Sequence, residues 1–181
     1  MIMATCEEFE LVLRRGISAR RAGQFSEAFQ HMNKAAAMCG DDQEMNRALV
    51  FRELGELARN SHDLNAAQAH YEQAVVLLRP LDDRLKLAHT IRHLGDVHME
   101  RGHWNEAERC FTEALDIYRS HPSPGALDLA NAVRAYAALK TKLGHCKEAR
   151  NLWVEAGALY QSEGITAGVE ECRRQADQLA S

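Results

Sequence analysis

Three arginines recur along the chain at nearly the same interval. Arg52 and Arg92 are separated by almost the same length of chain as Arg92 and Arg134. The guanidinium group is planar and always charged, and it donates two parallel hydrogen bonds to a carboxylate. Arginines at a constant interval therefore suit the recognition of acidic side chains or of a C-terminal carboxylate, which is the chemistry of binding rather than of catalysis.

Two histidines beside the second arginine have a spacing that metal ligands also use. His89 and His93 lie four residues apart, which places both imidazoles on one face of a helix. Asp96 is near, but no third ligand stands in obvious register, so no metal site is predicted. A pH-sensitive contact or a solvated pair is the expectation instead.

Sequence motifs of catalysis are absent. The chain has no glycine-rich phosphate loop, no Gly-x-Ser-x-Gly and no His-Glu-x-x-His segment. We therefore predict no catalytic residue, no cofactor and no enzyme activity.

The elements that position these side chains belong to a pattern that occurs four times at nearly equal intervals. In each copy a small residue is followed, always at the same three distances, by an alanine, a large apolar residue and a second alanine. The copies are Gly16, Ala28, Met32 and Ala35; Gly55, Ala67, Tyr71 and Ala74; Gly95, Ala107, Phe111 and Ala114; and Ala137, Ala149, Trp153 and Ala156. A fixed period of this length predicts a stack of similar units and a binding surface.

The second copy shows why each unit is expected to be a pair of helices. Apolar residues recur at three- and four-residue intervals, the period of a helix. Gly55 lies inside the first helix, where glycine costs about 1 kcal/mol relative to alanine, so its recurrence predicts close contact with the second helix. Ala67 and Ala74 share one face of that second helix, and Tyr71 between them is expected to fill the gap. Asn65 is expected to cap its N-terminus.

The third copy carries a family resemblance. A bulky residue, a Leu-Gly pair, an alanine, an aromatic residue and a further alanine stand at Ile91, Leu94, Gly95, Ala107, Phe111 and Ala114. This order resembles a tetratricopeptide repeat. The repeats here are longer than the family's roughly 34 residues and are similar in length to those of the kinesin-light-chain-like branch. The resemblance extends over nearly the whole chain.

This resemblance implies an all-α fold, a right-handed α-solenoid of four helix hairpins followed by a C-terminal capping helix. We expect repeats at residues 5–40, 43–80, 82–121 and 125–162 and the capping helix at 163–181. Two positions depart from the motif: Arg15 stands where leucine is expected in the first copy, and Tyr136-Ala137 replaces Leu-Gly in the fourth. The last helix is expected to cover the final apolar face of the stack.

In this family the first helix of each pair lines the concave face, so the resemblance implies a set of groove residues. The candidate peptide-binding residues are Arg14, Arg52, Glu56, His89, Arg92, His93, Asn131 and Arg134. Arginines on adjacent hairpins would stand about 10 Å apart, the usual helix packing distance. Asn131 and His89 are expected to hydrogen-bond the main chain of a peptide.

The arginines also have a second interpretation. Arg52 precedes Glu56 by four residues, and Arg92 precedes Asp96 by four. Ion pairs of this kind on a solvated helix face each stabilise the helix by about 0.2–0.5 kcal/mol. Arg134 lacks a pair of this kind. The sequence leaves open whether the arginines bind a ligand or form a solvated face.

Composition narrows the class of partner. The formal net charge of −4 argues against a nucleic-acid partner, and the absence of a long apolar run argues against a membrane span. Residues 1–10 have no secretory-type segment. The five cysteines include no Cys-x-x-Cys pair and are expected to be reduced thiols, which favours a cytoplasmic protein.

The sequence thus predicts a non-catalytic scaffold or adaptor that binds a peptide segment of a partner protein in its concave groove. An acidic segment or a free C-terminus is the favoured peptide chemistry. Two alternatives stay open: a self-association module that forms a homodimer, and a ligand-sensing repeat subunit of a regulatory complex.

Overall fold

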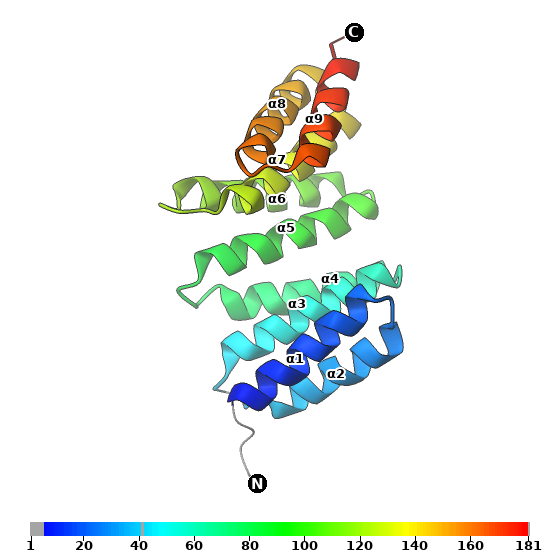
Figure 1. Cartoon of the computed structure of the whole chain (residues 1–181), viewed down its shortest axis with the longest axis vertical. Coiled ribbons are helices and arrows are strands. Elements are labelled where there is room, and N and C mark those ends of the chain that lie inside the picture. Colours follow the sequence, from blue (N-terminus) through cyan, green and yellow to red (C-terminus); the bar gives the residue numbers. More distant parts are fainter. Residues whose placement is uncertain (1–5, 41, 181) are drawn as a thin grey trace. The chain divides into compact units, whose positions relative to one another are not determined.

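The structure is a computed structural model that describes residues 6–40 and 42–180, and every regular element in these ranges is a helix. The helices are α1 (Cys6–Arg21), α2 (Phe25–Met38), α3 (Glu44–Asn60), α4 (Leu64–Leu78), α5 (Arg84–Glu100), α6 (Trp104–Ser120), α7 (Ala126–Lys142), α8 (Cys146–Ser162) and α9 (Thr166–Gln178) (Figure 1). The predicted all-α fold is confirmed. Residues 5 and 181, the first residue of the predicted repeats and the last of the predicted capping helix, lie outside the described residues. None of the described helices combines the length and apolar character needed to cross a membrane.

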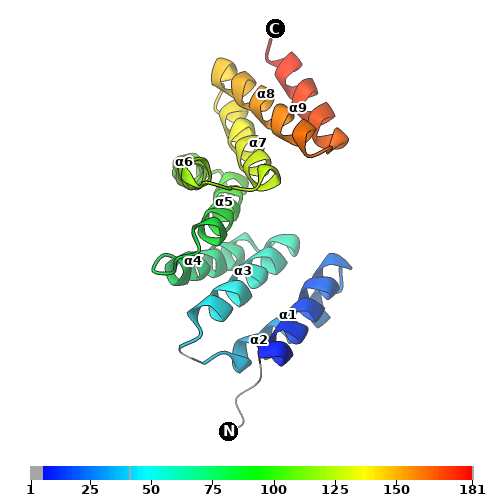
Figure 2. The same cartoon turned by 60° about the vertical axis from the view of Figure 1, so that its left-hand side comes forward.

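Consecutive helices pack within two compact units, Met1–Asp83 and Arg84–Ser181. In the first unit α1 packs against α2, α2 against α3, and α3 against α4. In the second unit α5 packs against α6 and α7, α6 against α7, and α8 against both α7 and α9. Figure 2 shows the hairpin of α7 and α8 in yellow and orange, with α9 in red beside α8. Each unit therefore holds two successive hairpins, and the second unit adds a final helix.

The two arms of a hairpin meet where a glycine of the first helix lies against a large side chain of the second. A Cβ atom on Gly55 would lie 2.9 Å from the ring of Tyr71, which is fully buried. The same close approach occurs between Gly16 and Met32 and between Gly95 and Phe111. At Gly55 and Gly95 a methyl group would overlap a buried aromatic ring, and at Gly16 it would displace the flexible end of Met32, so the predicted close helix contact is confirmed.

A tight turn reverses the chain between the arms. After α7, Gly144 has a φ of 76°, its N–H donates to the carbonyl of Thr141, and the N–H of His145 donates to the carbonyl of Lys140. This left-handed conformation carries no steric penalty for glycine and satisfies the last carbonyl groups of the helix. In the second hairpin His62 takes the left-handed conformation instead, with a φ of 61°.

The N-terminus of α4 is capped earlier than the sequence indicated. Asp63 is its N-cap residue, and its Oδ1 accepts a hydrogen bond from the N–H of Ala66 at 3.0 Å. The prediction that Asn65 caps this helix is wrong. Because the left-handed residue His62 ends the turn, the next side chain is the first one placed over the unsatisfied N–H groups of α4.

Helix α9 packs on α8 through small and apolar residues. Cys172 and Ala176 are buried, and a Cβ atom on Gly157 of α8 would lie 3.3 Å from that of Cys172. Burial raises the pKa of the Cys172 thiol to about 11. The thiol is therefore neutral at pH 7 and acts as a small apolar packing group.

Replacing Gly55 with alanine tests the contact that closes the hairpin. At a solvent-exposed position within a helix, replacing glycine with alanine stabilises the helix by about 1 kcal/mol. At Gly55, however, the new methyl group meets the buried ring of Tyr71. We expect the free energy of unfolding to fall by about 1–3 kcal/mol, the usual effect of overpacking. Urea unfolding followed by circular dichroism measures the change.

The matched control is the same substitution in a Tyr71→Leu background. The smaller side chain leaves room for the methyl group, so Gly55→Ala should destabilise that protein less than it destabilises the wild type. A Gly55→Ala protein more stable than the wild type would contradict the close contact.

Candidate functional site

All eight candidate residues lie on the first helices of hairpins. The first unit holds Arg14 on α1 and Arg52 and Glu56 on α3, and the second unit holds His89, Arg92 and His93 on α5 and Asn131 and Arg134 on α7. Each group has its own neighbours within its unit.

In the first unit the arginines are bound by glutamates. Arg14 is exposed and pairs with Glu10 at 3.0 Å. Arg52 donates a hydrogen bond to Glu53 at 2.8 Å, and the same carboxylate accepts one from Arg20 of α1 at 3.2 Å. Since the side chain of Glu53 is buried, this contact ties α1 to α3.

Glu56 is held by the second helix of its own hairpin. Its Oε1 accepts a hydrogen bond from the hydroxyl of Tyr71 at 2.7 Å, and its Oε2 lies 3.8 Å from Nη1 of Arg20. The ring of Tyr71 is the one that lies over Gly55, so the carboxylate satisfies the polar end of a buried aromatic side chain. This candidate residue therefore supports the packing of the hairpin.

On α5 an arginine, two histidines and an aspartate form a compact polar cluster. Nη1 of Arg92 lies 3.1 Å from Oδ2 of Asp96, which is the intrahelical pair considered from the sequence. Nη2 of Arg92 lies 2.6 Å from Nε2 of His93, which in turn lies 3.2 Å from Nε2 of His89. Arg92 is only 7% exposed. Its guanidinium is thus engaged by neighbours on its own helix.

A residue of α7 extends this cluster. Oδ1 of Asp128 lies 3.7 Å from Nδ1 of His89. The neighbouring imidazole of His89 is the main cause that holds the pKa of Asp128 below its usual value; burial opposes this shift, and the charges of Arg92 and His93 add to it. Sequence reasoning missed Asp128, although it follows His89 by about one repeat interval.

The candidates on α7 contact the two helices that follow. Nη1 of Arg134 lies 3.6 Å from Oε1 of Glu171 on α9, and both side chains are more than a third exposed. Oδ1 of Asn131 accepts a hydrogen bond from the hydroxyl of Tyr160 on α8 at 2.7 Å. Sequence reasoning did not find Glu171, because its position depends on how α9 docks.

Each arginine among the candidates therefore has a carboxylate neighbour in its own unit. An external carboxylate would therefore have to displace the internal one in order to bind at any of these arginines. Replacing the internal carboxylate is easiest at Arg134, because its pair with Glu171 is part-exposed and such pairs contribute only about 0–1 kcal/mol to the stability of the fold. It is hardest at Arg92, whose short pair with Asp96 is nearly buried.

A second polar cluster, which sequence reasoning missed, joins α6, α7 and α8. Nζ of Lys140 lies 2.6 Å from Glu108 and 3.1 Å from Glu148, and it stands 5.0 Å from the centre of the Tyr136 ring. Burial alone would lower the pKa of Lys140, but hydrogen bonds with Glu108, Tyr136 and Glu148 outweigh it, so the pKa is raised. The hydrogen bond from Lys140 also lowers the pKa of Glu108.

The repeat alignment contains the signal for this cluster. Three residues after the small residue of each first helix, the copies hold Ala19, Ala58, His98 and Lys140. Lys140 is only 5% exposed, and an ammonium group at a buried position requires carboxylate partners.

Within the described residues, no group of three or more His, Cys, Asp or Glu side chains could hold a metal ion. His89 and His93 approach each other, but the guanidinium of Arg92 lies against the ring nitrogen of His93 that faces His89. A cation at that point would meet a positive charge.

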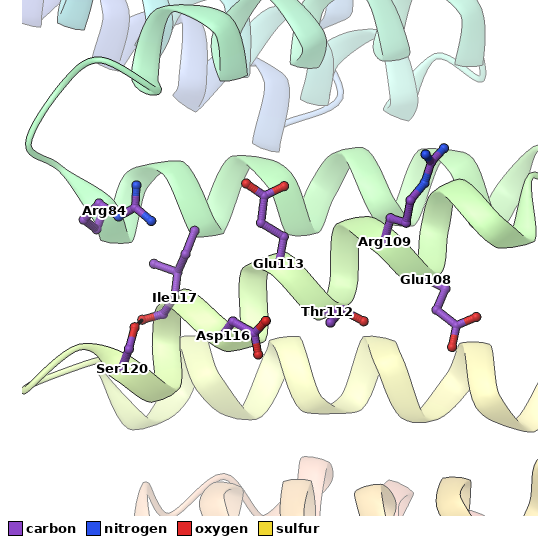
Figure 3. Close-up of a pocket in the computed structure, with 8 residues that line it drawn as sticks. All are labelled: Arg84, Glu108, Arg109, Thr112, Glu113, Asp116, Ile117 and Ser120. Atoms are coloured by element: carbon purple, nitrogen blue, oxygen red, sulfur yellow. Dashed lines mark hydrogen bonds between the residues drawn. The ribbon is translucent and has the colours of Figure 1, made fainter.

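Helix α6 carries an open depression of about 640 Å³, lined mostly by charged and hydroxyl residues. Its lining residues are Arg84, Glu108, Arg109, Thr112, Glu113, Asp116, Ile117 and Ser120 (Figure 3). Figure 3 shows Arg109 and Glu113 directed to one side of α6 and Glu108 and Asp116 to the other. Because these charged groups diverge, they do not converge on one ligand atom.

The contact between α5 and α7 can be tested at Asp128. We expect His89→Ala to raise the pKa of Asp128 towards its ordinary value, since the imidazole contact that mainly lowers this pKa is lost. The folded-state pKa lies below the unfolded one, so this contact stabilises the protein above the unfolded pKa, and the stabilisation is lost as pH falls through the folded pKa. Carbon-13 NMR titration of the carboxyl group measures the shift.

His145→Ala serves as the control, and an unchanged pKa of Asp128 in His89→Ala would contradict the contact.

The sequence matches the profile of one protein family. The tetratricopeptide repeat profile matches at residues 44–120 and again at residues 86–162. A comparison with curated proteins finds no significant match.

Solved structures support the same fold. The chain is similar to BtubC (BKLC) from P. vanneervenii, with a TM-score of 0.69 and 15% identity over 96% of this chain and 79% of that one. It is also similar to a signal transduction ATPase with numerous domains (STAND) and a tetratricopeptide repeat sensor from Pyrococcus horikoshii, with a TM-score of 0.81 and 11% identity. That match covers 93% of this chain and 26% of the other. These likenesses concern the fold alone.

The two profile matches overlap and together cover more than half of the sequence. The resemblance expected from the sequence is therefore confirmed, and the chain belongs to the tetratricopeptide repeat family.

Proposed function

We propose that this protein is a non-catalytic scaffold or adaptor that binds a peptide segment of a partner protein on the first helices of its hairpins. Tetratricopeptide repeats generally mediate protein–protein interaction and are generally not enzymes. The scattered cysteines make the cytoplasm the proposed location.

The observation that carries this proposal is a pair of exchangeable contacts in the second unit. His89 with Asp128 joins α5 to α7, and Arg134 with Glu171 joins α7 to α9, at 3.7 and 3.6 Å. All four side chains are at least about a third exposed. A carboxylate of a partner can replace Asp128 or Glu171 with little loss, because part-exposed pairs contribute little. The favoured peptide therefore carries acidic side chains or a free C-terminus.

The other candidates of the second unit have supporting roles in this proposal. Arg92 contacts His93, and His93 contacts His89, so the two inner residues orient the imidazole that meets the peptide. Asn131 uses its amide oxygen for Tyr160, which leaves the amide nitrogen as the group that we assign to a peptide carbonyl.

We propose a corresponding surface on the first helices of the first unit. Arg14 is the candidate that meets a peptide there, because its side chain is 78% exposed. Arg52 and Glu56 are engaged by Glu53 and Tyr71 and would shape the surface from beneath.

The likeness to a tetratricopeptide repeat sensor favours a second candidate function, a ligand-sensing subunit of a regulatory complex. The chain spans 26% of the matched STAND protein, so in this case a partner would supply the remaining functions. In this second candidate function, binding of a ligand would regulate the activity of another protein. In the first, binding of a peptide only recruits the protein that carries the peptide.

The test is a pull-down from lysate of the source organism, quantified by mass spectrometry. The wild type is compared with a His89→Ala/Arg134→Ala double variant and with Arg119→Ala. Arg119 is the matched control, since it is also part-exposed and makes two hydrogen bonds to Glu155, at 2.8 and 3.0 Å, away from the candidate residues. We expect the double variant to lose partners that the wild type and Arg119→Ala both capture.

Peptides made from a captured partner then give dissociation constants. We expect binding to weaken with added salt, because Arg134 is charged, and to weaken at least about tenfold in the double variant, as for the loss of two polar contacts. Equal capture by all three proteins would contradict a site on the first helices. A wild-type protein that sediments as a dimer without any partner would favour the self-association alternative.

A further inference from the structure

Tyr118 of α6 is a buried tyrosine with an unsatisfied hydroxyl group. Its side chain is fully buried, and the hydroxyl has no hydrogen-bond partner among the described residues. Burial raises the pKa of Tyr118, so the hydroxyl keeps its proton at neutral pH and remains a donor. A buried donor without an acceptor costs free energy, and most buried hydroxyl groups in proteins are paired. An acceptor within reach of this hydroxyl is therefore expected.

The next hairpin shows which residue accepts at the equivalent place. Tyr118 of α6 and Tyr160 of α8 each follow the large packing residue of their helix by seven positions. The hydroxyl of Tyr160 donates to Oδ1 of Asn131 at 2.7 Å. Asn131 stands six residues before the small residue of α7, and His89 stands six residues before Gly95 of α5. The repeat thus pairs Tyr118 with His89.

The imidazole of His89 carries a suitable acceptor atom. Nδ1 of histidine and Oδ1 of asparagine are separated from Cα by the same number of bonds, so a turn of the side chain brings Nδ1 to the equivalent place. The side chain of His89 is 32% exposed, which leaves it room to turn. The charges of Asp128 and Arg92 both act on the Tyr118 hydroxyl, which therefore lies close to the contact between α5 and α7.

The observed position of the His89 ring suits its protonated form. Nδ1 faces the carboxylate of Asp128 at 3.7 Å, so a favourable contact requires a proton on Nδ1. Nε2 faces Nε2 of His93 at 3.2 Å. That atom of His93 accepts from Arg92, because a guanidinium group only donates. A favourable contact with His93 therefore requires a proton on Nε2 of His89 as well.

A neutral His89 cannot keep both contacts. The neutral imidazole carries one proton, so a lone pair would face either Asp128 or His93. The hydroxyl of Tyr118 offers a proton to that lone pair. Histidine is the side chain whose charge ordinarily changes between about pH 5 and 8. The charged and titratable groups around this imidazole are Arg92, His93 and, behind them, Asp96 on α5, Tyr118 on α6 and Asp128 on α7.

We propose that the imidazole of His89 has two positions, one beside Asp128 when it is protonated and one beside the buried hydroxyl of Tyr118 when it is neutral. In the second position Nδ1 accepts the hydrogen bond of Tyr118, as Oδ1 of Asn131 accepts that of Tyr160. The ring is then withdrawn from the contact between α5 and α7. The consequence for binding rests on the proposed function: an acidic peptide that uses His89 is held at low pH and released as the pH rises.

Nitrogen-15 NMR of the histidines in the free protein tests the two positions without any peptide. At about pH 5 we expect protons on both ring nitrogens of His89, and at about pH 8 a single proton on Nε2. The Tyr118 hydroxyl proton should exchange slowly at the higher pH and show a nuclear Overhauser effect to the His89 ring. These signals report the position of the imidazole directly.

Three variants identify the partner of the neutral ring. In Tyr118→Phe we expect the tautomer protonated on Nε2 to fall at least about twofold at the higher pH, since the hydrogen bond that selects it is lost. Tyr160→Phe is the matched control, because it removes the equivalent hydroxyl of the next hairpin and should leave His89 unchanged. His89→Asn copies the arrangement of that hairpin, so the Tyr118 hydroxyl proton should exchange slowly at both pH values.

A peptide from a captured partner reports the regulation of binding. At about pH 8 its affinity should be at least about twofold higher in Tyr118→Phe than in the wild type, because Tyr118 no longer competes for the imidazole. This readout is lost if the proposed function is wrong. The tautomer and the hydroxyl proton are measured on the free protein, so they test the two positions in either case.

The proposal is overturned if the His89 tautomer at the higher pH is the same in Tyr118→Phe as in the wild type. It is also overturned if the wild-type Tyr118 hydroxyl proton exchanges rapidly there, or if Tyr160→Phe changes the tautomer as much as Tyr118→Phe does. Both tyrosine variants keep the aromatic ring, and circular dichroism checks their fold. If Tyr118→Phe is unfolded, His89→Asn decides through the hydroxyl proton, since it changes only a part-exposed side chain.

Discussion

The contact between a glycine of one helix and a large buried side chain of the next is the constraint on which the rest of this structure depends. Gly55 against Tyr71 is the clearest case, since a single methyl group would already collide with the ring. Such a contact fixes how closely and in which register two helices pack. It also positions the residues that follow: Glu56 and Asp96 directly follow the packing glycines Gly55 and Gly95, and both carboxylates are held in polar contacts beside the packed helices.

With the hairpin fixed, the chain varies its surface chemistry without changing its fold. The side chain three residues after the packing position is alanine in two copies, histidine in one and lysine in the last. At the lysine, carboxylates from two other helices close the surface. At Ala58, the corresponding surface remains open and apolar. A repeat fold is suited to this kind of divergence, because each hairpin interacts mainly with its immediate neighbours.

The hairpins could be predicted from the sequence because their packing is periodic. The small residue, the two alanines and the large side chain recur at fixed spacing, and each lies where that spacing indicated. Asn65 was predicted wrongly as a helix cap, because the left-handed conformation of His62 cannot be inferred from residue preference. The pairing of Arg134 with Glu171 was also beyond prediction, since it depends on how α9 docks beside α7 and α8. Contacts that recur with the repeat, within a helix or between the two arms of a hairpin, are thus readable from spacing, whereas contacts that do not recur require the relative placement of the helices.

The protein is thus a repeat structure whose hairpin contacts give rigidity and whose outward side chains are proposed to give recognition. Recognition on the first helices is tested most directly by hydrogen–deuterium exchange of the wild type with and without a captured partner. We predict added protection of amides in α5 and α7, whose outward residues form the exchangeable pairs. Added protection confined to α6 and α8, or none in either pair of helices, would contradict this claim.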